Sequence, residues 1–97
     1  MSNNKVVIIT GGNRGIGLGI TRSFLEADYN VIIGARNQPE IDNENLTFHY
    51  TDVRKEEDHI KLSNIGIEKY GRIDCYINNA GFSEWRPIDK IDNKFLT

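Results

Sequence analysis

Apolar residues in this chain occur in short β-branched runs that alternate with segments of helical spacing. Residues 6–9 and 31–33 are continuous apolar runs. This pattern is typical of strands buried on both faces, as in a parallel sheet. Between the two runs, Ile16, Ile20 and Phe24 recur at every fourth position, which predicts an amphipathic helix. The first third of the chain therefore reads as strand, helix, strand.

The middle of the chain adds a loop and a third strand. Residues 37–45 are polar and contain one proline, which indicates a loop. Residues 46–51 alternate between apolar and polar, which predicts a strand with one wetter face near a sheet edge. Residues 73–77 are a fourth strand candidate, and residues 88–97 resemble the beginning of another helix.

A second helix is predicted over residues 55–70. Ile60, Ile67 and Tyr70 are spaced for one helical face, and Gly71 is a plausible stop signal. Strands that alternate with helices predict right-handed crossovers and a parallel sheet. We therefore expect an α/β fold, the first half of a doubly wound sheet.

Length and charge narrow the possible functions. The 97 residues suffice for one domain, residues 1–97, and the net charge of −2 gives no basic face for nucleic acid. The single cysteine and the short apolar run near the N-terminus favour a cytoplasmic protein without a membrane span. His49 and His59 lack neighbours at metal-ligand spacing, so we expect surface or edge residues and no metal site.

Three glycines follow the first predicted strand. Gly11, Gly15 and Gly17 lie in the segment TGGNRGIG, where a strand ends and a helix begins. Unpaired backbone N–H groups and the helix dipole favour an anion there, and glycines let a phosphate approach closely. The spacing is neither G-x-G-x-x-G nor a P-loop, since Leu18 replaces the P-loop lysine. The alternative is a glycine-rich turn without a ligand.

Three motifs together resemble one family. TGGNRGIG resembles the TGxxxGIG signature of classical short-chain dehydrogenases/reductases, Asp52 and Val53 follow the third strand, and residues 78–81 read NNAG after the fourth. The resemblance extends over the whole chain and implies a Rossmann-like fold that binds a dinucleotide. The candidate cofactor-binding residues are Gly11, Asn13, Arg14, Gly15, Ile16, Gly17, Arg36, Asp52, Val53, Asn79, Ala80 and Gly81.

The resemblance also implies roles within this set. The glycine segment would wrap the pyrophosphate, and residues 79–81 would pass the ribose. Asp52 would accept a hydrogen bond from the adenine amino group, and the backbone of Val53 would meet the ring. Asn78 would tie the sheet together rather than touch the ligand.

The end of the second strand favours NADP(H) over NAD(H). An NAD enzyme of this type usually has an acidic residue there, which hydrogen-bonds the ribose hydroxyls. This chain has Ala35 and then Arg36, with Arg14 as a second cation in the glycine segment. Guanidinium groups pair well with a 2′-phosphate. NAD(H) remains possible if Arg36 is an ordinary surface residue.

Family chemistry is hydride transfer between the nicotinamide and a carbonyl or alcohol substrate, with Ser, Tyr and Lys as catalytic residues. None of the four tyrosines has a lysine four positions later. Tyr50 with Arg54 is the nearest imitation, and it falls beside the adenine site. The tyrosines are Tyr29, Tyr50, Tyr70 and Tyr76.

The resemblance places the catalytic residues after Thr97, so none is assigned within the chain. We expect a domain truncated before its catalytic half, inactive alone, and a parent enzyme that forms a dimer or tetramer. An unpaired fourth strand at the sheet edge fits this expectation. The alternatives are a non-catalytic NADP(H)-binding module and a half-chain that pairs with a partner.

Overall fold

A sheet of four parallel strands lies at the centre of the chain in a computed structural model that describes residues 4–79. The strand order is β3-β2-β1-β4, and every pairing is parallel. This confirms the predicted α/β fold. The elements in chain order are β1 (Val6–Thr10), α1 (Gly15–Glu26), β2 (Asn30–Ala35), β3 (Leu46–Tyr50), α2 (Glu56–Tyr70) and β4 (Cys75–Asn78). The helix expected over residues 88–97 lies outside the described residues.

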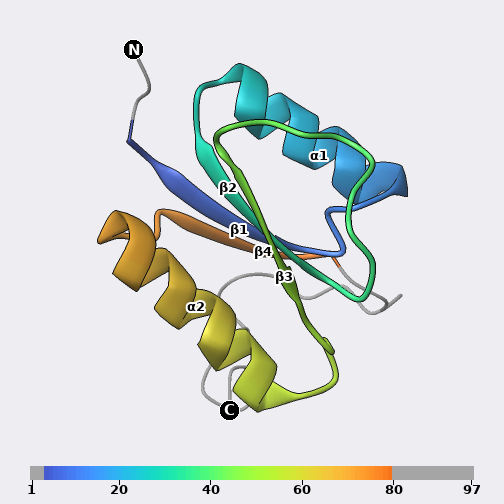
Figure 1. Cartoon of the computed structure of the whole chain (residues 1–97), viewed down its shortest axis with the longest axis vertical. Coiled ribbons are helices and arrows are strands. Elements are labelled where there is room, and N and C mark those ends of the chain that lie inside the picture. Colours follow the sequence, from blue (N-terminus) through green and yellow to red (C-terminus); the bar gives the residue numbers. More distant parts are fainter. Residues whose placement is uncertain (1–3, 80–97) are drawn as a thin grey trace, which may run out of the picture.

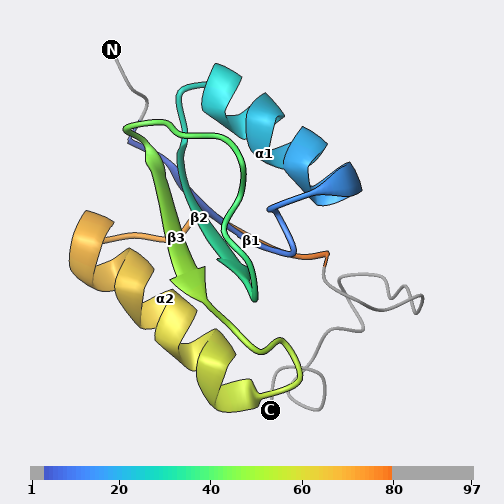
Figure 2. The same cartoon turned by 45° about the vertical axis from the view of Figure 1, so that its right-hand side comes forward.

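The two helices cover opposite faces of the sheet, as Figures 1 and 2 show. All five residues of β1 are fully buried, so alternate side chains feed two separate cores. Val7 and Ile9 face α1, where Ile20, Phe24 and Leu25 pack against them. On the other face, the buried residues are Val6, Ile8, Ile32 and Leu62, the last from α2. The continuous apolar runs of the sequence thus belong to strands buried on both faces.

Two residues of the predicted helical faces are placed differently by the structure. Ile60 and Ile67 are 54% and 52% exposed, so the expected apolar face of α2 is wrong. The buried face instead carries Leu62 and Gly66. A Cβ atom at Gly66 would lie 3.0 Å from Cγ1 of Ile73, so the missing side chain lets α2 approach that residue closely. Size, rather than hydrophobicity alone, selects the packed face.

A similar correction applies to the start of α1. Ile16 is 80% exposed, although it shares the spacing of Ile20 and Phe24. It lies in the first turn, immediately after Gly15, whereas Ile20, Phe24 and Leu25 of the later turns pack against the core.

The ends of the elements follow local signals. Gly71 ends α2 with a left-handed φ of 80°, the conformation that glycine adopts most readily. Within residues 4–79, β3 pairs only with β2 and forms one edge of the sheet, as the wetter pattern predicted. β4 begins at Cys75 instead of Ile73, and the carboxylate of Asp74, the residue before it, accepts the Val6 N–H at 2.8 Å. Among the described residues, no helix is long and apolar enough to cross a membrane.

Close packing between β2 and α2 gives a first prediction. A Cβ atom at Gly34 would collide with Cδ1 of Leu62 and lie 2.8 Å from Oγ1 of Thr51. We expect Gly34→Ala to lower the free energy of unfolding by about 1–3 kcal/mol through overpacking.

Gly19 in α1 provides the matched control, because a Cβ atom there has no neighbour within 4 Å. Gly19→Ala should raise the free energy of unfolding by roughly 0.5–1 kcal/mol through helix propensity. Urea unfolding of both variants measures the two effects. Equal stability of Gly34→Ala and the wild type would contradict the packing argument.

Candidate functional site

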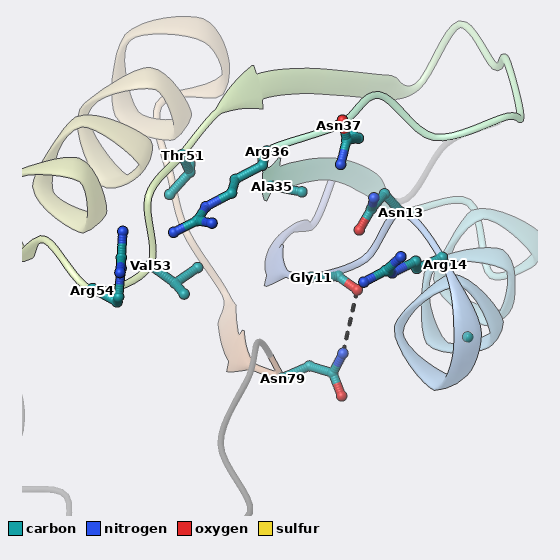
Figure 3. A pocket seen from close by; sticks show the side chains of 11 residues that line it. Gly11, Asn13, Arg14, Ala35, Arg36, Asn37, Thr51, Val53, Arg54 and Asn79 are labelled. Atoms are coloured by element: carbon teal, nitrogen blue, oxygen red, sulfur yellow. Dashed lines mark hydrogen bonds between the residues drawn. The ribbon is translucent and has the colours of Figure 1, made fainter.

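The carboxyl ends of all four strands meet at one edge of the sheet, and a cavity of about 530 Å³ opens there. Between β1 and β4 the strand order reverses, which is where open α/β sheets bind ligands. Segments from the loops after all four strands surround the cavity in Figure 3. The lining residues are Gly11, Asn13, Arg14, Gly15, Ala35, Arg36, Asn37, Thr51, Val53, Arg54 and Asn79.

The glycine segment turns sharply between β1 and α1. Gly11 and Gly15 have φ angles of 69° and 59°, which glycine adopts without the strain of a side chain. The Gly11 N–H donates to the Gly34 carbonyl oxygen at 2.8 Å, which anchors the turn to β2. The Gly11 carbonyl oxygen accepts a bond of 3.3 Å from Nδ2 of Asn79, the dashed line in Figure 3. The loop after β4 is thereby tied to the loop after β1.

Helix α1 begins at Gly15, within this glycine segment. Gly17 is buried, and a Cβ atom there would collide with the Gly11 carbonyl oxygen and lie 2.6 Å from Nδ2 of Asn79. Arg14 occupies the N-cap position without a side-chain cap, and the first turn carries no acidic residue. The first backbone N–H groups of α1 are therefore left to a ligand or to water. An uncapped helix N-terminus beside a cavity is suited to an anion.

Hydroxyl and amide side chains brace the ends of the two central strands. Oγ1 of Thr10 is buried and donates to Oδ1 of Asn78 at 2.8 Å. This bond joins the last residues of β1 and β4, which is the role that the family resemblance implied for Asn78. It also leaves Asn79, the next residue, to line the cavity.

Asp52 lies under one wall of the cavity and is held by Arg54. Oδ1 of Asp52 accepts the Arg54 N–H at 3.0 Å and its Nε at 3.1 Å, and Oδ2 accepts Nη2 at 3.1 Å. These bonds hold the pKa of the Asp52 carboxyl far below its usual range, so it is ionised at neutral pH. An ionised carboxylate offers about four acceptor positions, so Oδ2 retains capacity for another donor.

His59 fixes the loop that follows β3, which corrects its assignment as a surface residue. Its ring is half-buried, with Nε2 lying 2.8 Å from the Val53 carbonyl oxygen and Nδ1 lying 2.5 Å from Oη of Tyr76. A carbonyl oxygen can only accept, so Nε2 carries the proton. Burial raises the pKa of the Tyr76 phenol, which therefore stays protonated and donates to Nδ1. The helix, the loop and β4 are joined through one imidazole.

The structure brings together most of the predicted site residues. Ile16, Gly17 and Asp52 are near the cavity without being among its lining residues. Ala80 and Gly81 lie outside the described residues. The lining residues that the sequence analysis did not assign as binding residues are Ala35, Asn37, Thr51 and Arg54. Ala35 is the last residue of β2, and the other three lie within four residues after a strand end. This position is the signal that could have found them, because parallel strands place such residues at one edge.

The cavity wall is rich in guanidinium groups. Arg14, Arg36 and Arg54 all line it, and no Asp or Glu is among the described residues that do so. In Figure 3 the guanidinium of Arg14 points toward Gly11, whereas that of Arg36 points away from Arg14, toward Val53 and Arg54. The part of the chain that the structure describes contains no group of three or more His, Cys, Asp or Glu residues that could hold a metal ion. Guanidinium groups along the wall make the cavity suited to an anionic ligand.

Comparison with known proteins agrees with this geometry. Residues 5–96 match the sequence profile of the short chain dehydrogenase family. The chain belongs to this family. It is 42% identical over 83 residues to an L-fucose dehydrogenase of Bos taurus, which covers 80% of this chain and 31% of that protein. It is 35% identical over 106 residues to a 1,2-dihydroxy-1,2-dihydronaphthalene dehydrogenase of Pseudomonas putida, covering 98% of this chain and 41% of that protein.

Solved structures of the family share this fold. The structure of ElxO with NADP bound superposes with a TM-score of 0.72 at 33% identity, covering 93% of this chain and 40% of that one. The ligand-free aldohexose dehydrogenase of Thermoplasma acidophilum gives a TM-score of 0.74 at 27% identity, covering 93% and 34%. The chain thus spans less than half the length of these short chain dehydrogenases.

The link through His59 can be tested at Tyr76. We expect Tyr76→Phe to lower the free energy of unfolding by about 1 kcal/mol, because Nδ1 of His59 loses its donor. Tyr50→Phe is the control, since Tyr50 is 60% exposed. That variant should stay within about 0.5 kcal/mol of the wild type. Urea unfolding distinguishes the two, and equal effects would contradict a structural role for this hydrogen bond.

Proposed function

We propose that this chain is the cofactor-binding portion of an NADP(H)-dependent oxidoreductase. The whole protein would transfer hydride between the nicotinamide and a small carbonyl or alcohol substrate. One observation carries the cofactor assignment. β2 ends at Ala35 and is followed by Arg36, which lines the cavity, so a cation stands where an NAD enzyme has an acid.

Electrostatics favour the phosphorylated cofactor. The side chain of Arg36 is 55% exposed, so it can pair with a ligand without losing buried contacts. Arg14 stands across the cavity and supplies a second guanidinium. A 2′-phosphate bound between them would form charge-assisted, bidentate hydrogen bonds that a ribose hydroxyl cannot match. The NADP bound to ElxO, a relative of the same fold, is consistent with this assignment.

The rest of the dinucleotide is assigned along the same edge. The uncapped N-terminus of α1 would bind the pyrophosphate, through the segment from Gly11 to Gly17. Asp52 and the backbone of Val53 would receive the adenine. Asn79, Ala80 and Gly81 would pass the nicotinamide ribose. We propose these roles from the position of each residue after its strand and from the family to which the chain belongs.

The cofactor would supply the hydride, and the protein would orient it and exclude water. The 97 residues contain no Tyr-x-x-x-Lys, so we assign the proton donor to a part of the protein outside them. The same assignment gives the whole protein its substrate pocket and its dimer or tetramer contacts. A half-chain that pairs with a partner is the second candidate, because β4 pairs only with β1 among the described residues.

Titration of the intact protein with NADPH and NADH tests the assignment. We expect NADPH to bind more tightly. Arg36→Gln should weaken NADPH binding by about 10- to 100-fold, because a hydrogen-bonded charge pair is lost, and should change NADH binding little.

Arg22→Gln removes the same charge from an exposed position in α1 and is the matched control. It should leave both dissociation constants near their wild-type values. Tighter binding of NADH than of NADPH by the wild type would overturn the preference for NADP(H). Failure to bind either dinucleotide would overturn the proposed function as a whole.

A further inference from the structure

Two guanidinium groups approach a single carboxylate beside the cavity. Asp52 is 8% exposed, and Arg54 engages both of its oxygens through Nε, Nη2 and its own backbone N–H. Nη2 of Arg36 lies 3.6 Å from Oδ1 of Asp52, which is within the range of an ion pair and beyond that of a good hydrogen bond. Arg54 therefore satisfies the carboxylate, and Arg36 stands next to it.

The geometry favours Arg54 over Arg36 as the partner of the Asp52 carboxylate. Its guanidinium presents Nε and Nη2 side by side to the two carboxylate oxygens, the fork arrangement that makes such pairs strong. Its backbone N–H adds a third bond to the same carboxylate from only two residues away. Arg36 reaches the carboxylate through a single nitrogen and across the sheet from the next strand.

We propose that Arg54 determines specificity for the phosphorylated cofactor by pairing with Asp52, which leaves the Arg36 guanidinium free for the 2′-phosphate. The pairing also offsets the charge of a carboxylate that would repel that phosphate. This inference rests on the NADP(H) function proposed above. Arg54 acts here through Asp52 and Arg36, so it is a positioning residue rather than a direct ligand of the phosphate.

Removal of Arg54 should redirect Arg36. Asp52 would remain ionised and nearly buried, and Arg36 is the cation already within 3.6 Å of it. The backbone N–H of residue 54 would still donate to Asp52. A nearly buried carboxylate without a cationic partner is nevertheless costly, so Arg36 would close that distance. The 2′-phosphate would then compete with Asp52 for Arg36 and face an unbalanced negative charge. NAD(H) carries a hydroxyl at this position and would lose little.

The ratio of the NADH and NADPH dissociation constants, measured on the intact protein, tests the inference. Both cofactors share the adenine and the pyrophosphate, so the ratio cancels a general loss of affinity or of folded protein. Arg54→Met should reduce this ratio by about tenfold, on the scale of coupling between neighbouring charges. Arg54→Lys, which retains a cation beside Asp52, should recover part of it.

The double variant Asp52→Asn with Arg54→Met separates the indirect effect from a direct contact. With the carboxylate charge removed, the 2′-phosphate has no competitor for Arg36, and the ratio should return most of the way to its wild-type value. If Arg54 instead bound the phosphate directly, the double variant would keep the low ratio of Arg54→Met. That result would overturn the inference.

Arg72 offers a matched control in the same chain. It pairs with Asp74 through Nε at 3.0 Å and through Nη2, the same arrangement two residues apart. This pair lies beside the start of β1, since Asp74 accepts the Val6 N–H. Arg72→Met removes one positive charge at the opposite edge of the sheet and should leave the ratio unchanged.

The outcomes for the inference and for the proposed function are distinguishable. Wild-type protein that binds NADH more tightly contradicts the NADP(H) assignment, whatever the variants do. A ratio in Arg54→Met equal to that of the wild type overturns the role of Arg54, even if the wild type prefers NADPH. A tenfold fall that the double variant reverses supports it.

Discussion

Strand β1 is buried along its whole length, and this requirement organises the rest of the structure. Its side chains alternate between two faces, so each face needs its own helix. α1 leaves β1 to cover one face and leads to β2, whereas α2 covers the other face and leads to β4. The chain therefore departs in opposite directions on the two sides of β1. This topology alone creates the crevice at the carboxyl ends of β1 and β4, whatever residues line it.

The charge of the cavity is a local property that the whole-chain composition conceals. The chain has a net charge of −2, yet three guanidinium groups line the cavity. Asp52 is the carboxylate that stands behind them, and it is held by one of the three. Because Arg54 offsets the charge of that carboxylate, Arg14 and Arg36 leave the cavity wall with net positive charge, although Arg36 also lies 3.6 Å from Asp52. The electrostatic field at the site therefore depends on which arginine pairs with Asp52.

Most of the fold could be predicted from the sequence, because its signals are local. Continuous β-branched runs mark strands buried on both faces, and Gly71 marks a helix end through its left-handed backbone. The packed face of α2 could not be predicted in this way. Ile60 and Ile67 have the correct spacing for a helix, but Gly66 is the position at which Ile73 and Ile32 approach. That choice depends on neighbours that only the folded sheet brings near.

The site shows the same division between local and distant contacts. The positions of the glycine segment, Asp52 and Asn79 were predictable because each begins within two residues of a strand end. His59 was not, since its partners Val53 and Tyr76 lie on a loop and a strand that fold against it. Arg54 carried a weaker signal. Asp side chains often accept the backbone N–H two residues later in an Asx turn, as Asp52 does with Arg54. Such a turn brings the side chains of the two residues together.

The position of Arg54 in turn depends on how α2 begins. Oδ2 of Asp58, in the first turn of α2, accepts the Asp52 N–H at 2.8 Å, and His59 holds the Val53 carbonyl oxygen. The backbone before Arg54 is thus tied to the helix at two successive residues. A loop fixed in this way requires little ordering when a ligand arrives, which favours affinity. The first turn of α2, on the face of the sheet opposite α1, therefore supports the cation arrangement that the cavity presents to the cofactor.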